Sequence, residues 1–374
     1  MARWARRAAT GLGVTALGLT LGCGNFWLYP GSLTGSSATG DYVYVANATT
    51  DSVAGFSVGT GTLTAVTSSP YSLSFTPTAV AVNPANSILF VAGNSLIYAF
   101  AIESGGALSV LNKGSAVGIA DVVSMDISPD GQWLLALDAN GITIDEFLIN
   151  STTGALGQVT GASYSLSGAT VLPRAIKVAP NGTLVFVALG SAGDLVYTFN
   201  TTSGALTSSQ QLSLGSSTAS DNALAVSPAS TYLYIARSGT GGGLAAYSIG
   251  TNGALAAVSG SPFSAGTQPY SVVVNKAGTD VYVANRGDSS ISGYSVASTG
   301  TLTALGASPY TSGSAVTALA VDNSGDYLLA AANGGSPDLT MYSFDSTTVG
   351  KLDLSTTTST GTDPTGPVSL AATH

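Results

Sequence analysis

A short motif of glycine, one variable residue and leucine recurs seven times along the chain at nearly constant spacing. Successive leucines lie 45, 48, 50, 49, 47 and 50 residues apart, and self-similarity at such a period indicates a repeat architecture. A single unit of this length cannot bury its apolar face alone, so neighbouring units must pack together. The seven leucines are Leu63, Leu108, Leu156, Leu206, Leu255, Leu302 and Leu352.

Each unit is expected to form four short strands joined by turns of Pro, Asp, Asn and Gly. The first strand of a unit is small and apolar, as in AVAV at 79–82 and ALAV at 318–321, which is typical of a strand buried on both faces. In the third unit, we expect strands over residues 122–128, 133–138, 142–149 and 156–162.

Seven four-stranded units predict an all-β fold, a seven-bladed β-propeller of antiparallel blades. The chain begins its first unit with YVYVAN at 42–47, a second-strand motif that recurs as VYVAN at 281–285 in the sixth unit. Its last apolar segment, PVSLAAT at 367–373, has the character of a first strand. We therefore expect this C-terminal strand to complete the first blade and close the ring.

The composition agrees with a propeller and excludes a disordered chain. Charged residues make up 8% of the sequence, against roughly 25% in an average globular protein. Hydrophobic residues make up 45% and there are 47 glycines, a combination that suits many strands joined by tight turns.

The N-terminal segment has the features of an export signal. Three arginines among the first seven residues precede an apolar run at 8–21, which is too short to span a bilayer comfortably. The run ends at Gly22 and Cys23, the only cysteine, and resembles a bacterial lipobox; the alternative is a plain secretory signal with an incidental cysteine. We expect a signal peptide over 1–22, lipidated Cys23 with a flexible tether over 23–40, and the propeller over 41–374.

The net charge that remains after cleavage of the signal peptide limits the classes of molecule that the protein can bind. Loss of three of the ten basic residues leaves seven against nineteen acidic ones, a net charge near −12. Such a surface repels nucleic acid and anionic lipid headgroups. We expect an exported monomer held in the cell envelope, at the outer membrane or cell surface, that meets the membrane only through its lipid anchor and binds no nucleic acid.

The motifs at 42–47 and 281–287, with the SPDG turn at 128–131, resemble the YVTN-type repeats of lactonase-like seven-bladed propellers. This group includes the propeller-type 6-phosphogluconolactonases and the fungal carboxymuconate cyclase, and the resemblance covers roughly residues 41–374. It implies the propeller fold and brings lactone hydrolysis into consideration.

Family enzymes are associated with a His, Arg and acidic cluster at the central opening. The single histidine of this chain is His374, which is expected at the opposite end as a frayed terminal residue.

Three arginines remain after cleavage, and propeller topology places all of them on one face. Arg174 begins a first strand, while Arg237 and Arg286 follow second strands of the next two blades. Together they could hold a carboxylate or phosphate, because the guanidinium fork matches both groups. The alternative is that each arginine pairs with a local acid, the candidates being Asp194, Asp221 and Asp288.

Two functions remain open. In the first, the arginine-bearing face binds a small anionic metabolite, a sugar acid or lactone, or a surface protein. In the second, the arginines polarise a lactone carbonyl and Asp126 or Asp221 activates water as a base; for Asp126 the alternative is a carboxylate that hydrogen-bonds to backbone. No metal site or cofactor is expected, because the sequence has no His/Cys cluster, calcium-loop spacing or phosphate-binding glycine loop. Two expectations favour the binding function over lactone hydrolysis: the protein is exported, and its single histidine is not expected at the central opening.

Overall fold

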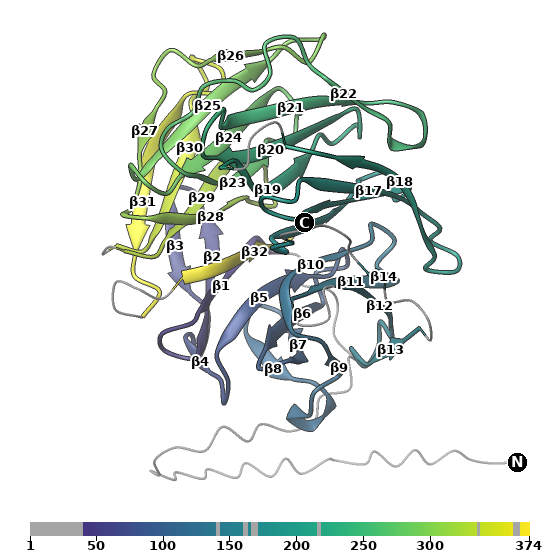
Figure 1. Cartoon of the computed structure of the whole chain (residues 1–374). Coiled ribbons are helices and arrows are strands. Elements are labelled where there is room, and N and C mark those ends of the chain that lie inside the picture. The colour runs from purple at the N-terminus through teal and green to yellow at the C-terminus, as the bar shows by residue number, and fades with distance from the viewer. Residues whose placement is uncertain are drawn as a thin grey trace, which may run out of the picture.

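The computed structural model describes residues 40–139, 143–159, 164–165, 171–214, 218–334, 337–361 and 367–374. Seven antiparallel sheets stand around a common axis, and the innermost strand of each contacts those of its two neighbours (Figure 1). The predicted seven-bladed propeller is therefore confirmed. Helix within these residues is limited to the single 3-10 turns η1 (Asn112–Gly114) and η2 (Thr251–Gly253), and neither is long enough to cross a membrane.

Each blade has one strand at the axis of the ring and three strands further out. From the axis outwards, blade 1 consists of β32 (Pro367–Ala372), β1 (Tyr42–Asn47), β2 (Ser52–Gly59) and β3 (Thr62–Ala65). Blade 2 consists of β5 (Pro77–Val82), β6 (Ile88–Gly93), β7 (Leu96–Ile102) and β8 (Leu108–Val110). Blade 3 consists of β10 (Val122–Ile127), β11 (Trp133–Asp138), β12 (Thr143–Ile149) and β13 (Leu156–Gln158). Blade 4 consists of β15 (Ala175–Val178), β16 (Leu184–Ala188), β17 (Asp194–Phe199) and β18 (Leu206–Leu212).

The other three blades have the same arrangement of strands. Blade 5 consists of β19 (Ser220–Val226), β20 (Tyr232–Ser238), β21 (Gly243–Ile249) and β22 (Leu255–Ala257). Blade 6 consists of β23 (Pro269–Val274), β24 (Asp280–Asn285), β25 (Ser290–Val296) and β26 (Leu302–Ala304). Blade 7 consists of β28 (Val316–Val321), β29 (Tyr327–Ala332), β30 (Leu339–Phe344) and β31 (Leu352–Thr358). Short strands pair with the third strand of four blades: β4 (Tyr71–Ser72), β9 (Gly118–Ile119), β14 (Tyr164–Ser165) and β27 (Tyr310–Thr311).

The strand positions agree closely with the sequence pattern. The four strands predicted for the third unit correspond to β10, β11, β12 and β13. β13 ends at Gln158, and the predicted strand residues 142 and 160–162 lie outside the described residues. The two VYVAN motifs are the second strands β1 and β24 of blades 1 and 6. Their repetition therefore reflects equivalent places in two blades.

The prediction that first strands are buried on both faces holds for residues 79–82 of β5, which are all buried, but is wrong for most of the other first strands. It is the second strand that is enclosed: every residue of β1, β6, β11, β16 and β24 is buried. First strands such as β10 and β23 alternate between buried and half-buried or exposed residues. The reason is geometric, because one side of a first strand faces the axis of the ring and not another sheet.

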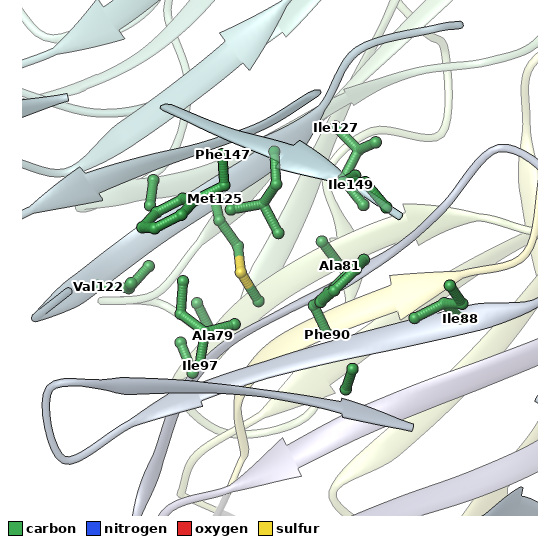
Figure 2. Close-up of a cluster of buried hydrophobic side chains, with 14 of the residues drawn as sticks. Ala79, Ala81, Ile88, Phe90, Ile97, Val122, Met125, Ile127, Phe147 and Ile149 are labelled. Carbon is green, nitrogen blue, oxygen red and sulfur yellow. The ribbon is translucent and has the colours of Figure 1, made fainter. Parts of the chain in front are cut away.

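The hydrophobic core is divided into layers between adjacent blades. Figure 2 shows the layer between blades 2 and 3, where Phe90 and Ile97 of one sheet face Met125 and Phe147 of the next. Each blade has one such layer on either side, so the burial of its apolar side chains depends on the two neighbouring blades.

Inner strands are also joined by hydrogen bonds between blades. A side chain on one first strand accepts a backbone N–H from the first strand of the following blade, which satisfies donors that would otherwise lack a partner at the sheet edge. The acceptor and donor pairs are Ser124 Oγ with Ile176 N (3.2 Å), Asp126 Oδ2 with Val178 N (2.8 Å), Ser271 Oγ with Leu319 N (3.1 Å) and Ser369 Oγ with Val80 N (3.3 Å).

The C-terminal strand closes the ring as predicted. β32 pairs antiparallel with β1, and in Figure 1 the yellow end of the chain lies beside the purple beginning of the propeller. Beyond β32, the Thr373 amide donates to the Tyr42 carbonyl at 2.9 Å, and the Tyr42 amide donates to Thr373 Oγ1 at 2.9 Å.

His374 is not the frayed residue that was expected. Its backbone amide donates to Asn86 Oδ1 at 2.8 Å, and Asn86 Nδ2 donates back to its carbonyl at 2.9 Å. The imidazole Nε2 lies 3.1 Å from the Val82 carbonyl, to which it donates. These contacts with blade 2 hold the terminus in place.

Candidate functional site

Two cavities lie on the axis of the ring. The upper cavity, of about 420 Å³, is lined by residues at the N-terminal ends of the inner strands, including Arg174 and Tyr270. The lower cavity, of about 320 Å³, is lined by residues at their C-terminal ends, including Asp126, Lys177 and His374. Because all inner strands run in the same direction along the axis, the two cavities belong to opposite faces of the propeller.

The upper cavity is surrounded by seven side chains, one from each blade, at equivalent positions of the inner strands. In six blades the residue is skipped in the pairing between first and second strands, a β-bulge that re-aims its side chain. In blade 4 it precedes β15 and its amide donates to the Ala188 carbonyl. We call these residues the axial ring; they are Thr78, Val123, Arg174, Asn222, Tyr270, Thr317 and Val368.

Sequence reasoning identified only Arg174 among the members of the axial ring. All seven members share a sequence pattern. Each is followed by a small residue, Ala or Ser, and in four blades the member is also preceded by proline. The pattern Pro-x-Ala/Ser at 77, 173, 269 and 367 therefore marks the position. Its significance appears only when the seven units are aligned and closed into a ring.

Arg174 is exposed and is the only charged side chain among the described residues that line the upper cavity. Its guanidinium has no hydrogen bond or ion pair within the described part of the chain. Arg286 reaches the same region indirectly, because its guanidinium carbon lies 5.0 Å from the ring centroid of Tyr270, a cation–π distance. Two of the three predicted arginines are thus associated with this cavity.

Arg237 has a different environment. Its Nε and Nη2 donate to Asp221 Oδ1 and Oδ2 at 2.6 and 2.8 Å, a bidentate pair in which Asp221 is fully buried. Its side chain lines a separate cavity of about 510 Å³ between blades 5 and 6. The three arginines therefore do not face one cavity, and for Arg237 the alternative of pairing with a local acid holds.

The acid considered for Arg286 is engaged elsewhere. Asp288 accepts hydrogen bonds from the Thr267 amide at 2.7 Å and from Ser290 Oγ at 2.9 Å. No ion pair between Asp288 and Arg286 occurs in the described structure. Arg286 is therefore placed by its contact with Tyr270.

A second aspartate lies beside the Arg237–Asp221 pair. Asp194 is 1% exposed, and neither of its carboxyl oxygens has a hydrogen-bond partner of normal geometry among the described residues. Burial, together with the negative charge of Asp221, raises the pKa of Asp194 well above its usual value. The cluster thus brings two carboxyl groups and one guanidinium together, and burial favours the neutral form of Asp194.

Asp126 lies at the lower cavity, away from the arginines. Its Oδ2 accepts the Val178 amide, as the backbone-bonding alternative expected, and its Oδ1 lies 3.4 Å from Lys177 Nζ. His374 lines the same lower cavity, on the side that strand direction predicted. The two carboxylates considered as bases are therefore separated from Arg174: Asp126 is at the other face and Asp221 is buried.

The described residues contain no group of three or more His, Cys, Asp or Glu side chains that could hold a metal ion. The predicted signal peptide and Cys23 lie outside the described residues.

Comparison with known families gives a match in the C-terminal part of the chain. The model of the family "Lactonase, 7-bladed beta-propeller" matches residues 256–366, a range that contains all the strands of blades 6 and 7. The predicted resemblance to the lactonase-like propellers is confirmed. A search of curated proteins gave no match to this sequence.

Solved structures share its fold over most of the chain. A candidate 6-phosphogluconolactonase from Bacteroides fragilis superposes with a TM-score of 0.72 and 18% identity, covering 92% of this chain and 100% of that protein. A Lactobacillus plantarum protein gives a TM-score of 0.72 and 19% identity over 90% of this chain and 100% of its own. The periplasmic gluconolactonase of Pseudomonas aeruginosa gives 0.66 and 15% identity over 89% and 99%. At these identities the likeness establishes the fold alone.

Proposed function

We propose that this lactonase-like propeller is a binding module that holds a small anionic molecule in its upper cavity. The observation that carries the proposal is the exposed guanidinium of Arg174, which has no ion-pair or hydrogen-bond partner among the described residues and lies among otherwise uncharged lining residues. A guanidinium presents a planar fork of donors that matches a carboxylate, and no protein acid of the described chain occupies this one. The family resemblance points to sugar acids and lactones as the first compounds to test.

Lactone hydrolysis is the second candidate, supported by the names of the structural neighbours and of the matching family. A hydrolase needs a base that activates water within reach of the group that polarises the carbonyl. Among the described lining residues of the upper cavity there is no carboxylate and no histidine. Asp126 lines the opposite cavity and Asp221 is 0% exposed, so the geometry favours binding over hydrolysis.

Replacement of Arg174 tests the binding site. We expect Arg174→Gln to weaken binding of a small carboxylate by about ten- to a hundred-fold, because one charge-assisted hydrogen-bonded contact is lost. Titration calorimetry with sugar acids, lactones and simple carboxylates measures this, and Lys113→Gln, which removes one positive charge from η1, is the matched control. The melting temperature should not change, since Arg174 is exposed and makes no side-chain bond within the described structure.

The same titrations separate the two functions. Lactones that are bound but not consumed support the binding module. Turnover of a lactone that disappears in Asp126→Asn would support the hydrolase and contradict the proposal. Equal affinity of Arg174→Gln and wild type for every ligand bound would show that the upper cavity is not the site.

We further propose that Cys23 carries the lipid that anchors the propeller in the cell envelope. Cys23→Ser is expected to move the protein from the membrane fraction to the soluble envelope fraction, while Ser32→Ala in the tether should leave it membrane-bound. Fractionation followed by mass spectrometry of the mature N-terminus measures both. A wild-type N-terminus without lipid would instead identify a plain secretory signal.

A further inference from the structure

We infer that the axial ring selects a monocarboxylate with an apolar body, such as an aromatic or branched acyl acid, over a phosphorylated or polyhydroxylated sugar. The inference rests on the proposed function of the upper cavity and adds the chemical class of its ligand. Three features of the ring carry it: its single charge, the engagement of its polar groups, and its apolar surface.

The charge of the cavity suits one carboxylate. Arg174 supplies one guanidinium, which can make two parallel hydrogen bonds to a carboxylate. The other guanidinium nearby, that of Arg286, is stacked over Tyr270. A phosphate group, with up to two negative charges and three acceptor oxygens, would leave charge and acceptors uncompensated in this setting.

Three polar side chains of the ring are already bonded to the protein. Thr78 Oγ1 donates to the Val122 carbonyl at 2.6 Å, and Thr317 Oγ1 donates to the Ala331 carbonyl at 3.3 Å. Asn222 Nδ2 donates to the Pro269 carbonyl at 2.8 Å and to Ser238 Oγ at 3.0 Å. A sugar with several hydroxyl groups would therefore give up hydrogen bonds to water and find few donors in exchange.

The rest of the lining offers apolar surface. Val123 is the bulged residue of β10 and is 36% exposed, although it belongs to an inner strand. Val368 takes the same position in β32, and Tyr270 adds an aromatic ring to the lining. The cavity is completed by the apolar residues Ala48, Pro77, Pro173, Ala175 and Ala223. Such a surface gains from contact with a hydrocarbon body next to the carboxylate.

A panel of matched probes tests the ligand class. We expect phenylacetate to bind at least about tenfold more tightly than gluconate or 6-phosphogluconate, because the sugar acids leave hydroxyls without partners. Phenylacetamide, which keeps the ring and loses the charge, should bind at least about tenfold more weakly than phenylacetate. Titration calorimetry with the mature protein measures all four probes.

A pair of substitutions locates the selectivity in the ring. Val123→Thr keeps the branched shape and adds a hydroxyl, so phenylacetate should lose affinity while gluconate does not. Val349→Thr is the matched control, because Val349 is 72% exposed and does not line the upper cavity. Identical affinities of the two variants for phenylacetate would overturn the assignment to the ring.

The outcomes distinguish the inference from the proposed function. If gluconate or 6-phosphogluconate binds more tightly than phenylacetate and Arg174→Gln abolishes that binding, the ligand class is wrong and the binding site stands. If no anion of the panel binds, or if binding does not depend on Arg174, both the ligand class and the proposed function are wrong.

Discussion

Deletion of residues 367–374 is expected to prevent the propeller from folding. The deletion removes β32, which pairs with β1 along its length and packs between the inner strands β5 and β28. It also removes Ser369 Oγ, the acceptor for the Val80 amide, and the two bonds between Thr373 and Tyr42. The truncated chain would expose an unpaired strand edge and apolar faces of blade 1, so we expect insoluble protein or loss of the cooperative melting transition.

Soluble yield, circular dichroism and thermal melting measure this effect. A chain that lacks only His374 is the control, because it keeps β32 and loses the contacts with Asn86 and Val82. We expect the control to fold with a slightly reduced melting temperature. A 367–374 deletion variant with the melting temperature of wild type would show that closure through β32 is not needed.

Arg237→Met is expected to destabilise the fold by roughly 3–5 kcal/mol, because removal of one partner leaves a buried charge uncompensated. The charge is that of Asp221, which is 0% exposed and bonded to two guanidinium nitrogens of Arg237. Methionine approximates the arginine side-chain stem, so most of the loss would be electrostatic. Chemical denaturation at neutral pH measures it.

The double variant Arg237→Met/Asp221→Asn serves as the control. It removes both charges and should recover a large part of the lost stability, since replacement of both partners of a buried pair costs much less than replacement of one. An Arg237→Met protein within about 1 kcal/mol of wild type, the range of an exposed pair, would show that the bridge behaves like a surface ion pair.

Asp194→Asn, a second variant in the same cluster, is expected to stabilise the fold as pH rises, in contrast to the destabilisation expected for Arg237→Met. In the unfolded chain Asp194 ionises near its usual pKa of 3.8, whereas burial raises the pKa in the fold. The folded state therefore holds its proton more tightly, and the stability due to Asp194 is lost as pH rises from about 3.8 towards the raised value. Asparagine cannot ionise, so Asp194→Asn should gain stability relative to wild type as pH rises through this window. A stability difference that does not vary with pH would contradict the raised pKa.

The sequence determined the architecture to a large extent. A motif at intervals of 45 to 50 residues specified seven units, and turn residues and short apolar runs within a unit located its strands. The terminal motifs at 42–47 and 367–373 were enough to predict how the ring closes. These features are local or repetitive, so they can be recognised before any two distant residues are known to be in contact.

The candidate site was decided by the tertiary structure. Arg174, Arg237 and Arg286 follow from topology as residues of one face, but the pairing of Arg237 with Asp221 depends on the register between β19 and β20. The axial ring also could not be assigned from one unit. Its members lie about one repeat apart, and in six of the seven blades a bulge in the inner strand, produced by pairing with the second strand, turns them towards the axis. Only closure of seven blades brings those side chains together around one cavity.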